Sequence, residues 1–186
     1  MSARAAALWV ARHAPVAVRG VCYGQSDVPL EIDHAPAADR IFSQLAPSGL
    51  EAIDCVWTSP TERTRGLAEA LGRRLGARVE VDPRLAELAF GAWEGRAYAE
   101  IEASDGARFT AWMNDWERAA PPGGECVADL VARIESWRES RAASEEVGLA
   151  ITHAGPIRAL RALLRGVEYA VVAAEVVDCL RLERVA

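Results

Sequence analysis

Basic and imidazole side chains follow short apolar runs at three widely separated points of the chain. Arg12 and His13 come directly after the run ALWVA, and His153 comes directly after the run GLAIT. Arg63 closes a Ser-Pro-Thr-Glu-Arg stretch that follows a third run, DCVWT. The carboxyl ends of parallel strands meet at one edge of a sheet, where ligands collect. We therefore expect two histidines and two arginines to converge at that edge.

This set of side chains would suit a dianionic phosphoryl group. Arginine offers planar, fixed N–H donors that stay charged at any working pH. The helix expected after His153 would add free backbone N–H groups, beginning at Ala154, and the positive end of its dipole. A neutral imidazole such as that of His13 can attack phosphorus and form a covalent phosphohistidine. Positioning and charge stabilise the loose transition state of phosphoryl transfer, so this chemistry would need no metal and no cofactor.

A proton donor for the leaving alkoxide must come from elsewhere in the sequence. Residues 85–95 offer two carboxylates, Glu87 and Glu94, in a stretch that indicates a loop. A glutamate beside the bound phosphate could protonate the leaving oxygen. Glu94 could instead cap a turn. A lone Arg-His pair or a lone His at a strand end is more often structural, so the spacing alone leaves a phosphate site and a structural role equally open.

The elements that must position these residues alternate along the chain. The sequence predicts strands at 7–11, 54–58, 79–81, 148–152 and 178–185. It predicts helices at 34–45, from a start at 59–62 to about 75, at about 125–143 and at 155–164. Strands that alternate with helices indicate an α/β fold. We expect a three-layer α/β/α sandwich whose sheet is mostly parallel and covered on both faces.

Residues 82–125 interrupt the alternation. They are rich in aromatic residues and glycine and include a Pro-Pro-Gly-Gly stretch, which indicates a loop and two short helices packed as a cap. We therefore expect one domain over residues 1–186, with 82–125 as a cap-like insertion. Four aromatic residues could stack on a flat base of a substrate: Trp93, Trp112, Trp116 and, outside the insertion, Tyr23. Packing inside the cap is the more common role for such tryptophans.

Composition excludes several classes of protein. Of the 186 residues 51% are hydrophobic, and the net charge is −6, which argues against a nucleic-acid partner. All 21 basic residues are Arg, so neither a P-loop lysine nor a Schiff-base lysine is available. The apolar run at 5–11 is too short for a membrane span or a signal peptide, which favours a cytoplasmic protein. Four widely spaced cysteines, Cys22, Cys55, Cys126 and Cys179, indicate small buried side chains rather than a zinc site.

Five motifs in order, over about residues 7 to 160, resemble those of the histidine phosphatase superfamily, also called the phosphoglycerate mutase-like family. They are Arg12-His13-Ala14 for Arg-His-Gly, Ser59-Pro60-Thr61-Glu62-Arg63 for Ser-Pro-x-x-Arg, 85–95 for L-x-E…F-G-x-W-E-G, Gly123-Gly124-Glu125-Cys126 for Gly-Gly-Glu-Ser, and His153-Ala154-Gly155 for His-x-Gly. The resemblance implies that His13 is the phosphorylated nucleophile and that Arg12, Arg63 and His153 hold the phosphoryl oxygens. It implies that Glu87 is the general acid and then the base that activates water.

Within the superfamily, the α-ribazole phosphatase branch is the one that the chain resembles. The segment 20–30 is similar to its C-Y-G-x-x-D-x-P-L pattern, and 112–125 is similar to its W-x-x-D-W…P-P-G-G-E pattern. This resemblance implies removal of the 5′-phosphate of α-ribazole phosphate in cobalamin biosynthesis. Tyr23 and Gln25 lie on the loop after His13, and we expect them to contact the substrate. The chain departs from the family at three positions. Ala14 replaces Gly, Cys126 replaces Ser, and Arg19 stands near the usual Asn, where it would add charge at the phosphate or point to solvent.

Other functions stay open at this point. A phosphoglycerate mutase-like phosphotransferase would use the same site, but the chain lacks the longer insertion of true mutases; a broad-specificity small-molecule phosphatase is a further alternative. A non-catalytic protein that only binds phosphorylated ligands would lack at least one of the catalytic residues named above. A metallohydrolase built on His13, His34 and His153 lacks metal-binding spacing. We expect a small-molecule phosphomonoester as the partner, no nucleic acid or membrane, and a monomer or homodimer.

Overall fold

The structure is a computed structural model and describes residues 7–50, 52–141 and 144–185. Positions 5 and 6 of the expected N-terminal run lie outside these ranges, as do positions 142 and 143 of the helix expected near 125–143.

A five-stranded sheet with the strand order β3-β2-β4-β1-β5 forms the centre of the molecule. The strands are β1 (Ala7–Arg12), β2 (Cys55–Thr58), β3 (Arg78–Val81), β4 (Val147–Thr152) and β5 (Leu182–Arg184). β1, β2, β3 and β4 pair in parallel, and β5 is antiparallel to β1. The parallel register brings Arg12 opposite Thr152 and Thr58 opposite Ile151, so three strand ends meet at one edge.

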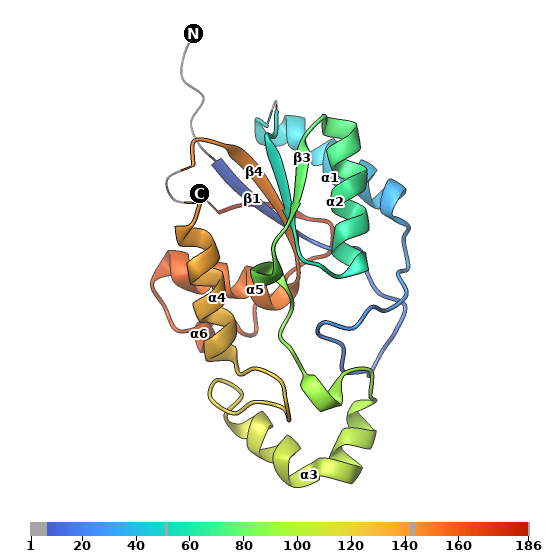
Figure 1. Cartoon of the computed structure of the whole chain (residues 1–186), viewed down its shortest axis with the longest axis vertical. Coiled ribbons are helices and arrows are strands. Elements are labelled where there is room, and N and C mark those ends of the chain that lie inside the picture. Colours follow the sequence, from blue (N-terminus) through green and yellow to red (C-terminus); the bar gives the residue numbers. More distant parts are fainter. Residues whose placement is uncertain (1–6, 51, 142–143, 186) are drawn as a thin grey trace.

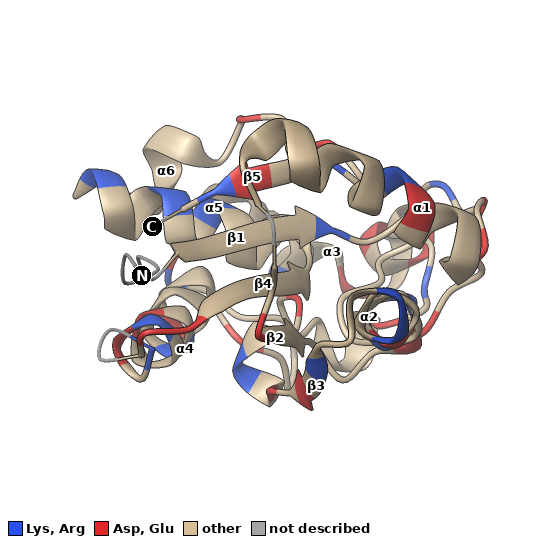
Figure 2. Cartoon of the chain, turned by 90° about the horizontal axis from the view of Figure 1, so that it is seen from above, with Lys and Arg blue, Asp and Glu red and all other residues tan. Residues whose placement is uncertain are grey.

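Helices cover both faces of this sheet, as the sequence predicts. α1 (His34–Leu45) and α2 (Glu62–Leu75) lie on one side of the strands; α4 (Val127–Glu139), α5 (Ala154–Arg165) and the short α6 (Tyr169–Val172) lie on the other (Figures 1 and 2). Successive strand residues point to opposite faces. Trp9 and Ala11 therefore join the core under α1 and α2, whereas Val10 joins the core under α4 and α5. The three-layer sandwich is confirmed.

The predicted cap lies beyond the carboxyl edge of the sheet (Figure 1). Its main element is α3 (Tyr98–Asn114), preceded by the short 3-10 helices Pro83–Leu85 and Gly91–Trp93. The two short helices expected here are the two helical parts of α3, which meet at the non-helical backbone of Asp105. The carboxylate of Asp105 accepts the indole N–H of Trp93, which is buried under the cap. The cap thus has a small core of its own, centred on Trp93, Cys22 and Ile101.

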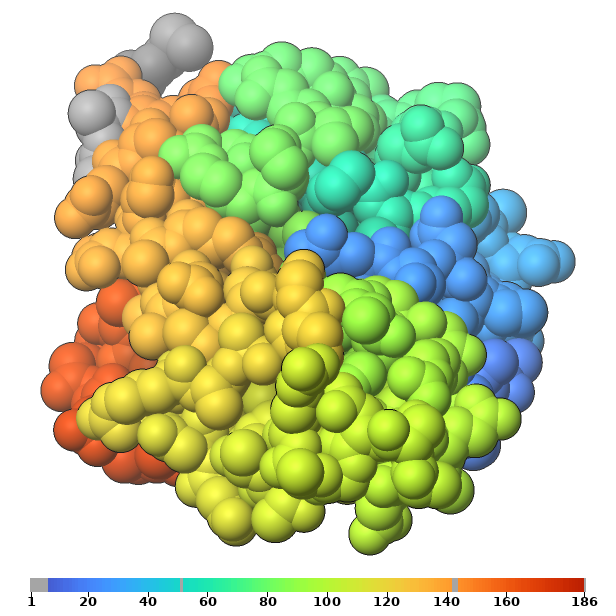
Figure 3. Space-filling model, turned by 60° about the horizontal axis from the view of Figure 1, so that its bottom comes forward, coloured from blue at the N-terminus to red at the C-terminus, as the bar shows by residue number. Residues whose placement is uncertain are grey.

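Figure 3 shows the yellow-green and yellow surface of the cap between the blue segment that follows β1 and the red-orange C-terminal segment. On the first side the backbone N–H of Cys22, in the loop after β1, donates to Arg96 O at 2.8 Å. On the second side Trp116 packs edge to face on Tyr169 of α6, with ring centroids 5.7 Å apart. These contacts place the cap over the edge where the strand ends meet.

The C-terminal segment differs from its prediction. A strand was expected over 178–185, but β5 spans only Leu182–Arg184. The reason is a turn at Leu180, whose φ of 58° lies in the left-handed region and whose N–H donates to Arg12 O. Before that turn, Cys179 forms only an isolated parallel bridge with Arg12. α6 was not predicted, because four residues carry too little periodicity.

The cysteines are all free, as expected, but only two are buried. Cys22 and Cys55 are buried, and burial raises the pKa of each thiol to about 12. Cys126 and Cys179 are half-buried. In the described ranges, no helix combines the length and the apolar character that crossing a bilayer requires.

Candidate active site

A cavity of about 410 Å³ opens at the carboxyl edge of the sheet, between the strand ends and the cap. Arg12 and His13 contribute to its floor from the end of β1, and Gly155 contributes from the first turn of α5. Glu87 and Tyr23 line it from two loops. A cavity of this size is typical of a small-molecule site. A second hollow, of about 220 Å³, lies at the opposite edge, beside Ala7 at the start of β1 and Glu146 just before β4.

His13 is buried and held by two backbone groups. Its Nδ1 lies 2.7 Å from Ala14 O, and its backbone N–H donates to Thr152 O at 3.1 Å. A carbonyl oxygen can only accept, so Nδ1 carries the proton and Nε2 keeps its lone pair. Burial first, and then the positive charge of Arg63, lowers the pKa of His13 to about 3. The ring is therefore a neutral base with a fixed tautomer.

His153 is fully buried at the end of β4 and contacts a group of hydroxyls. Its Nε2 lies 2.8 Å from Ser59 Oγ and 3.4 Å from Thr61 Oγ1. Thr64 Oγ1 donates to the backbone oxygens of Ser59 and Thr61 and lies 3.0 Å from Thr61 Oγ1.

The contact between His153 Nε2 and the Ser59 hydroxyl can have either atom as the donor. A Ser59 hydroxyl that donates to Nε2 would leave the proton of the neutral ring on Nδ1, which has no hydrogen-bond partner within the described ranges. Burial, together with the nearby His13 and Arg63, lowers the pKa of His153 well below its usual value.

Three buried nitrogens of this site have no hydrogen-bond partner within the described ranges. They are His153 Nδ1, Arg12 Nε and Arg63 Nε. The two imidazole rings meet edge to face with centroids 5.1 Å apart, and both arginines act electrostatically on both histidines. Buried N–H donors without partners are costly unless a ligand satisfies them. Their grouping beside a basic imidazole fits an anion.

The two arginines are fixed from outside the cavity. Arg12 Nη1 donates to Val177 O at 2.9 Å. Arg63, which is 1% exposed, donates to the backbone oxygens of Gly24 and Ser26 and lies over the ring of Tyr23. Both guanidinium groups are thus oriented before any ligand binds.

The structure separates the two candidate carboxylates. Glu87 lies in the cavity wall, and Gly155 N–H donates to both of its oxygens at 3.2 Å. A Cβ at position 155 would lie 2.1 Å from Glu87 Oε1, so any other residue there would displace the Glu87 carboxylate.

Glu94 instead holds a loop together. It accepts four backbone N–H groups, those of Gly24, Gln25, Ser26 and Phe90. Burial acts to raise the pKa of Glu94, but the donors at Gln25 and Phe90 outweigh it, and the net pKa is lowered. The turn-capping alternative is therefore the better description of Glu94.

Much of the cavity wall is aromatic. Phe90, Tyr98, Trp112, Trp116 and Tyr169 line it. Trp93, in contrast, is buried under the cap. Of the four aromatic residues predicted as possible stacking partners of a substrate, Trp93 therefore belongs to the core of the cap, whereas Trp112, Trp116 and Tyr23 line the cavity.

Several other predicted site residues lie at the margin of the cavity or away from it. Ala154 is the first residue of α5, and Gln25 donates its side-chain amide to Glu87 O at 3.1 Å. Arg19 is 74% exposed and ion-paired with Glu31 at 2.6 Å. His34 packs over Gly66 and lies 3.6 Å from Glu62, apart from the other two histidines. The described ranges contain no group of three or more His, Cys, Asp or Glu residues that could hold a metal ion.

Sequence reasoning missed Arg158 and Tyr169, which line the cavity. Arg158 lies one helical turn after Ala154, so helical spacing could have placed it on the same face. Its guanidinium donates to Glu175 O, which holds the segment after α6 beside the cavity. The short α6 carried no such signal.

Comparisons with known proteins agree with this geometry. Residues 8–178 match the family model described as "Histidine phosphatase superfamily (branch 1)". The adenosylcobalamin/alpha-ribazole phosphatase of Escherichia coli is 28% identical over 86% of this chain and 79% of that protein. A glucosyl-3-phosphoglycerate phosphatase of Mycolicibacterium vanbaalenii is 34% identical over 77% of this chain and 66% of its own length. The crystal structure of the alpha-ribazole phosphatase from Shigella flexneri superimposes with a TM-score of 0.85 at 27% identity, covering 96% of this chain and 89% of that one.

Proposed function

The chain belongs to the histidine phosphatase superfamily, and from that premise we propose that it is a phosphomonoesterase that acts through a phosphohistidine. The observation that carries the proposal is the grouping of unpartnered N–H donors around a neutral imidazole whose Nε2 is free to attack. The proposed site consists of His13, Arg12, Arg63, His153 and Glu87 in one domain whose cap is 82–125.

The first proposed step forms the phosphoenzyme. Nε2 of His13 attacks phosphorus, and the bond from phosphorus to the leaving oxygen breaks while Glu87 gives that oxygen its proton. Arg12 and Arg63 stabilise the charge on the phosphoryl oxygens, and His153 donates to one of them through Nδ1–H. The N–H groups at the start of α5, from Ala154 onward, add the positive end of a helix dipole.

The second proposed step regenerates the enzyme. Glu87, now a carboxylate, takes a proton from water, and that water attacks phosphorus. The P–Nε2 bond breaks, inorganic phosphate leaves, and His13 returns to the neutral tautomer that Ala14 O favours. No step is assigned to a metal or a cofactor.

For the substrate we propose a phosphomonoester whose leaving alcohol carries a flat aromatic base, with α-ribazole 5′-phosphate as the first choice. The aromatic residues of the cavity wall support this choice, as do the relatives named alpha-ribazole phosphatase. A phosphomonoester with a polar leaving alcohol, such as a glucosyl-3-phosphoglycerate, is the second candidate. The similarity to the mycolicibacterial phosphatase and the position of Arg158 in the cavity wall favour that candidate.

The test is phosphate release from a panel of phosphomonoesters in the presence of a chelator. The panel holds α-ribazole 5′-phosphate, a sugar phosphate, 3-phosphoglycerate and p-nitrophenyl phosphate. We expect His13→Ala to abolish release and to form no acid-labile phosphoenzyme, while the matched control His34→Ala keeps both. Full turnover by His13→Ala would overturn the mechanism. Equal rates across the panel would agree with the phosphohistidine mechanism but would contradict the proposed preference for α-ribazole 5′-phosphate.

A further inference from the structure

Glu87 lies on irregular backbone, which needs its own hydrogen-bond partners. The segment 84–87 begins inside the 3-10 helix Pro83–Leu85, continues beyond its end and joins no strand ladder. Backbone oxygens in such a half-buried segment must find donors elsewhere. Thr152 Oγ1 supplies one, to Leu85 O at 2.6 Å.

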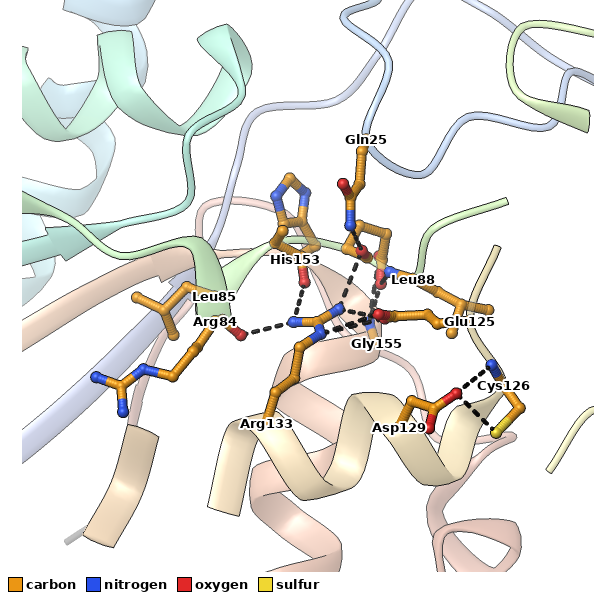
Figure 4. Close-up of polar contacts among 12 residues, drawn as sticks. Gln25, Arg84, Leu85, Leu88, Glu125, Cys126, Asp129, Arg133, His153 and Gly155 are labelled. Atoms are coloured by element: carbon orange, nitrogen blue, oxygen red, sulfur yellow. Dashed lines mark hydrogen bonds and ion pairs between the residues drawn. The ribbon is translucent and has the colours of Figure 1, made fainter. Parts of the chain in front are cut away.

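One side chain, that of Arg133 on α4, supplies donors to three other oxygens of this segment. Its Nη1 donates to Arg84 O at 2.6 Å and to Ala86 O at 2.7 Å, and its Nη2 donates to Glu87 O at 3.1 Å (Figure 4). A guanidinium has five N–H groups in a rigid fork. Three of the five thus bind consecutive parts of the chain that carries Glu87.

The remaining two N–H groups bind Glu125, the acidic residue of the Gly-Gly-Glu motif. Arg133 Nε lies 3.1 Å from Glu125 Oε1, and Nη2 lies 2.5 Å from the same oxygen. Both side chains are 18% exposed. All five donors are therefore used inside the protein, and none is left for a substrate.

We propose that the Arg133–Glu125 ion pair is a positioning device for the general acid, fixing the backbone at 84–87 so that the Glu87 carboxylate meets Gly155 N–H at the cavity wall. The inference rests on the proposed function. Arg133 and Glu125 are positioning residues, because they touch the peptide that carries Glu87 rather than the reacting atoms. A merely stabilising ion pair would affect every substrate alike.

Leaving-group dependence distinguishes the two roles. Good leaving groups depart without a proton, whereas poor ones depend on a well-placed acid. We would measure kcat/KM, which reports the step that breaks the P–O bond, for p-nitrophenyl phosphate, phenyl phosphate and an alkyl phosphate. The variants are Arg133→Met, Arg133→Lys, Glu125→Gln and Glu87→Gln. Arg84→Met is the matched control, since the Arg84 side chain joins the same segment to Ser136 of α4 without binding these oxygens.

We expect Arg133→Met to lower kcat/KM about 100-fold for the alkyl phosphate and less than about 3-fold for p-nitrophenyl phosphate, given the size of general-acid effects. Arg133→Lys, with three donors instead of five, should lie between it and wild type. Arg84→Met should leave the leaving-group dependence unchanged. In the Glu87→Gln background, Arg133→Lys should cause no further loss, because the group it positions is already absent.

Three outcomes would overturn the inference. Equal loss for all three substrates would assign Arg133 a general structural role, as would additive losses with Glu87→Gln. Unchanged rates in folded Arg133→Met would remove any role. If Arg133→Met does not fold, Arg133→Lys and Glu125→Gln carry the same comparison. A wild-type chain that hydrolyses neither these substrates nor α-ribazole 5′-phosphate would overturn the proposed function and this inference together, whereas the three outcomes named above leave the function intact.

Discussion

The Nδ1 atom of His13 lies 2.7 Å from the backbone oxygen of Ala14, its neighbour in the chain. This contact fixes the ring so that the basic nitrogen, Nε2, is the one available for attack. It forms at the position where Ala14 replaces the glycine usual in the family. The proposed nucleophile is therefore oriented by its own backbone rather than by a carboxylate on another element.

The first prediction concerns protonation of the buried histidines. Because burial and arginine charge lower the pKa of His13 to about 3 and that of His153 well below its usual value, neither ring should titrate near neutrality. NMR spectra of the ring carbons should show both residues unchanged between about pH 8 and pH 5, within the range where a free imidazole titrates. A midpoint near 6.5 for either ring would contradict the burial and charge described here.

The second prediction is the pH dependence of stability. The unfolded chain binds a proton at His13 near pH 6.5, whereas the folded chain binds it only near pH 3. Between these values the unfolded state holds more protons, so the free energy of unfolding falls as the pH falls. The slope is about 1.4 kcal/mol per pH unit for one such group, and His153 acts in the same direction. Urea unfolding at several pH values should show this loss, and His13→Gln should reduce it; an unchanged slope in the variant would contradict the prediction.

The third prediction concerns Ser59, whose hydroxyl contacts His153 Nε2 at 2.8 Å. Ser59→Ala removes the donor that keeps the proton of His153 on Nδ1, so kcat/KM should fall about 10-fold, the size of one lost hydrogen bond to a charged or reacting group. The ring ¹⁵N shifts of wild-type His153 should identify Nδ1 as protonated. Thr58→Ser, which leaves this contact in place, should behave as wild type. A protonated Nε2 in the wild type would refute this role of Ser59.

The fourth prediction concerns the aromatic wall. Trp116 lies against Tyr169 and lines the cavity, so Trp116→Ala should lower kcat/KM about 5- to 10-fold for an aromatic leaving group, by loss of an aromatic contact. An alkyl phosphate should react as before. Trp9→Phe, in the core under α1 and α2, serves as the control. Equal losses with both substrates would mean that Trp116 only supports the cap.

The fifth prediction concerns Arg19, which the sequence places near the phosphate. The structure gives it an exposed ion pair with Glu31, and such pairs contribute little. Arg19→Ala should therefore change kcat and KM by less than about twofold. A large rise in KM would show that this side chain turns inward when substrate binds.

The sequence by itself determined the sheet, its flanking helices and the residues that meet at its edge. Buried parallel strands appear as continuous apolar runs, and the residues that follow them must share one edge whatever the loops do. Arg12, His13, Arg63 and His153 are predictable for this reason, and the family motifs add the role of Glu87. The predicted length of the final strand was too great, because the apolar pattern does not reveal the left-handed turn at Leu180.

Only the tertiary structure decided which of several equivalent side chains does what. Glu87 and Glu94 are indistinguishable as loop glutamates. Only the fold surrounds Glu94 with four backbone N–H donors and places Glu87 in the cavity wall. Trp93 and Trp116 are likewise separated by packing alone. The contacts of Arg133 with residues 84–87 join segments nearly fifty positions apart, and no local pattern records them. Spacing along the chain reports what each element must be, whereas hydrogen bonds between distant loops depend on how the elements are packed.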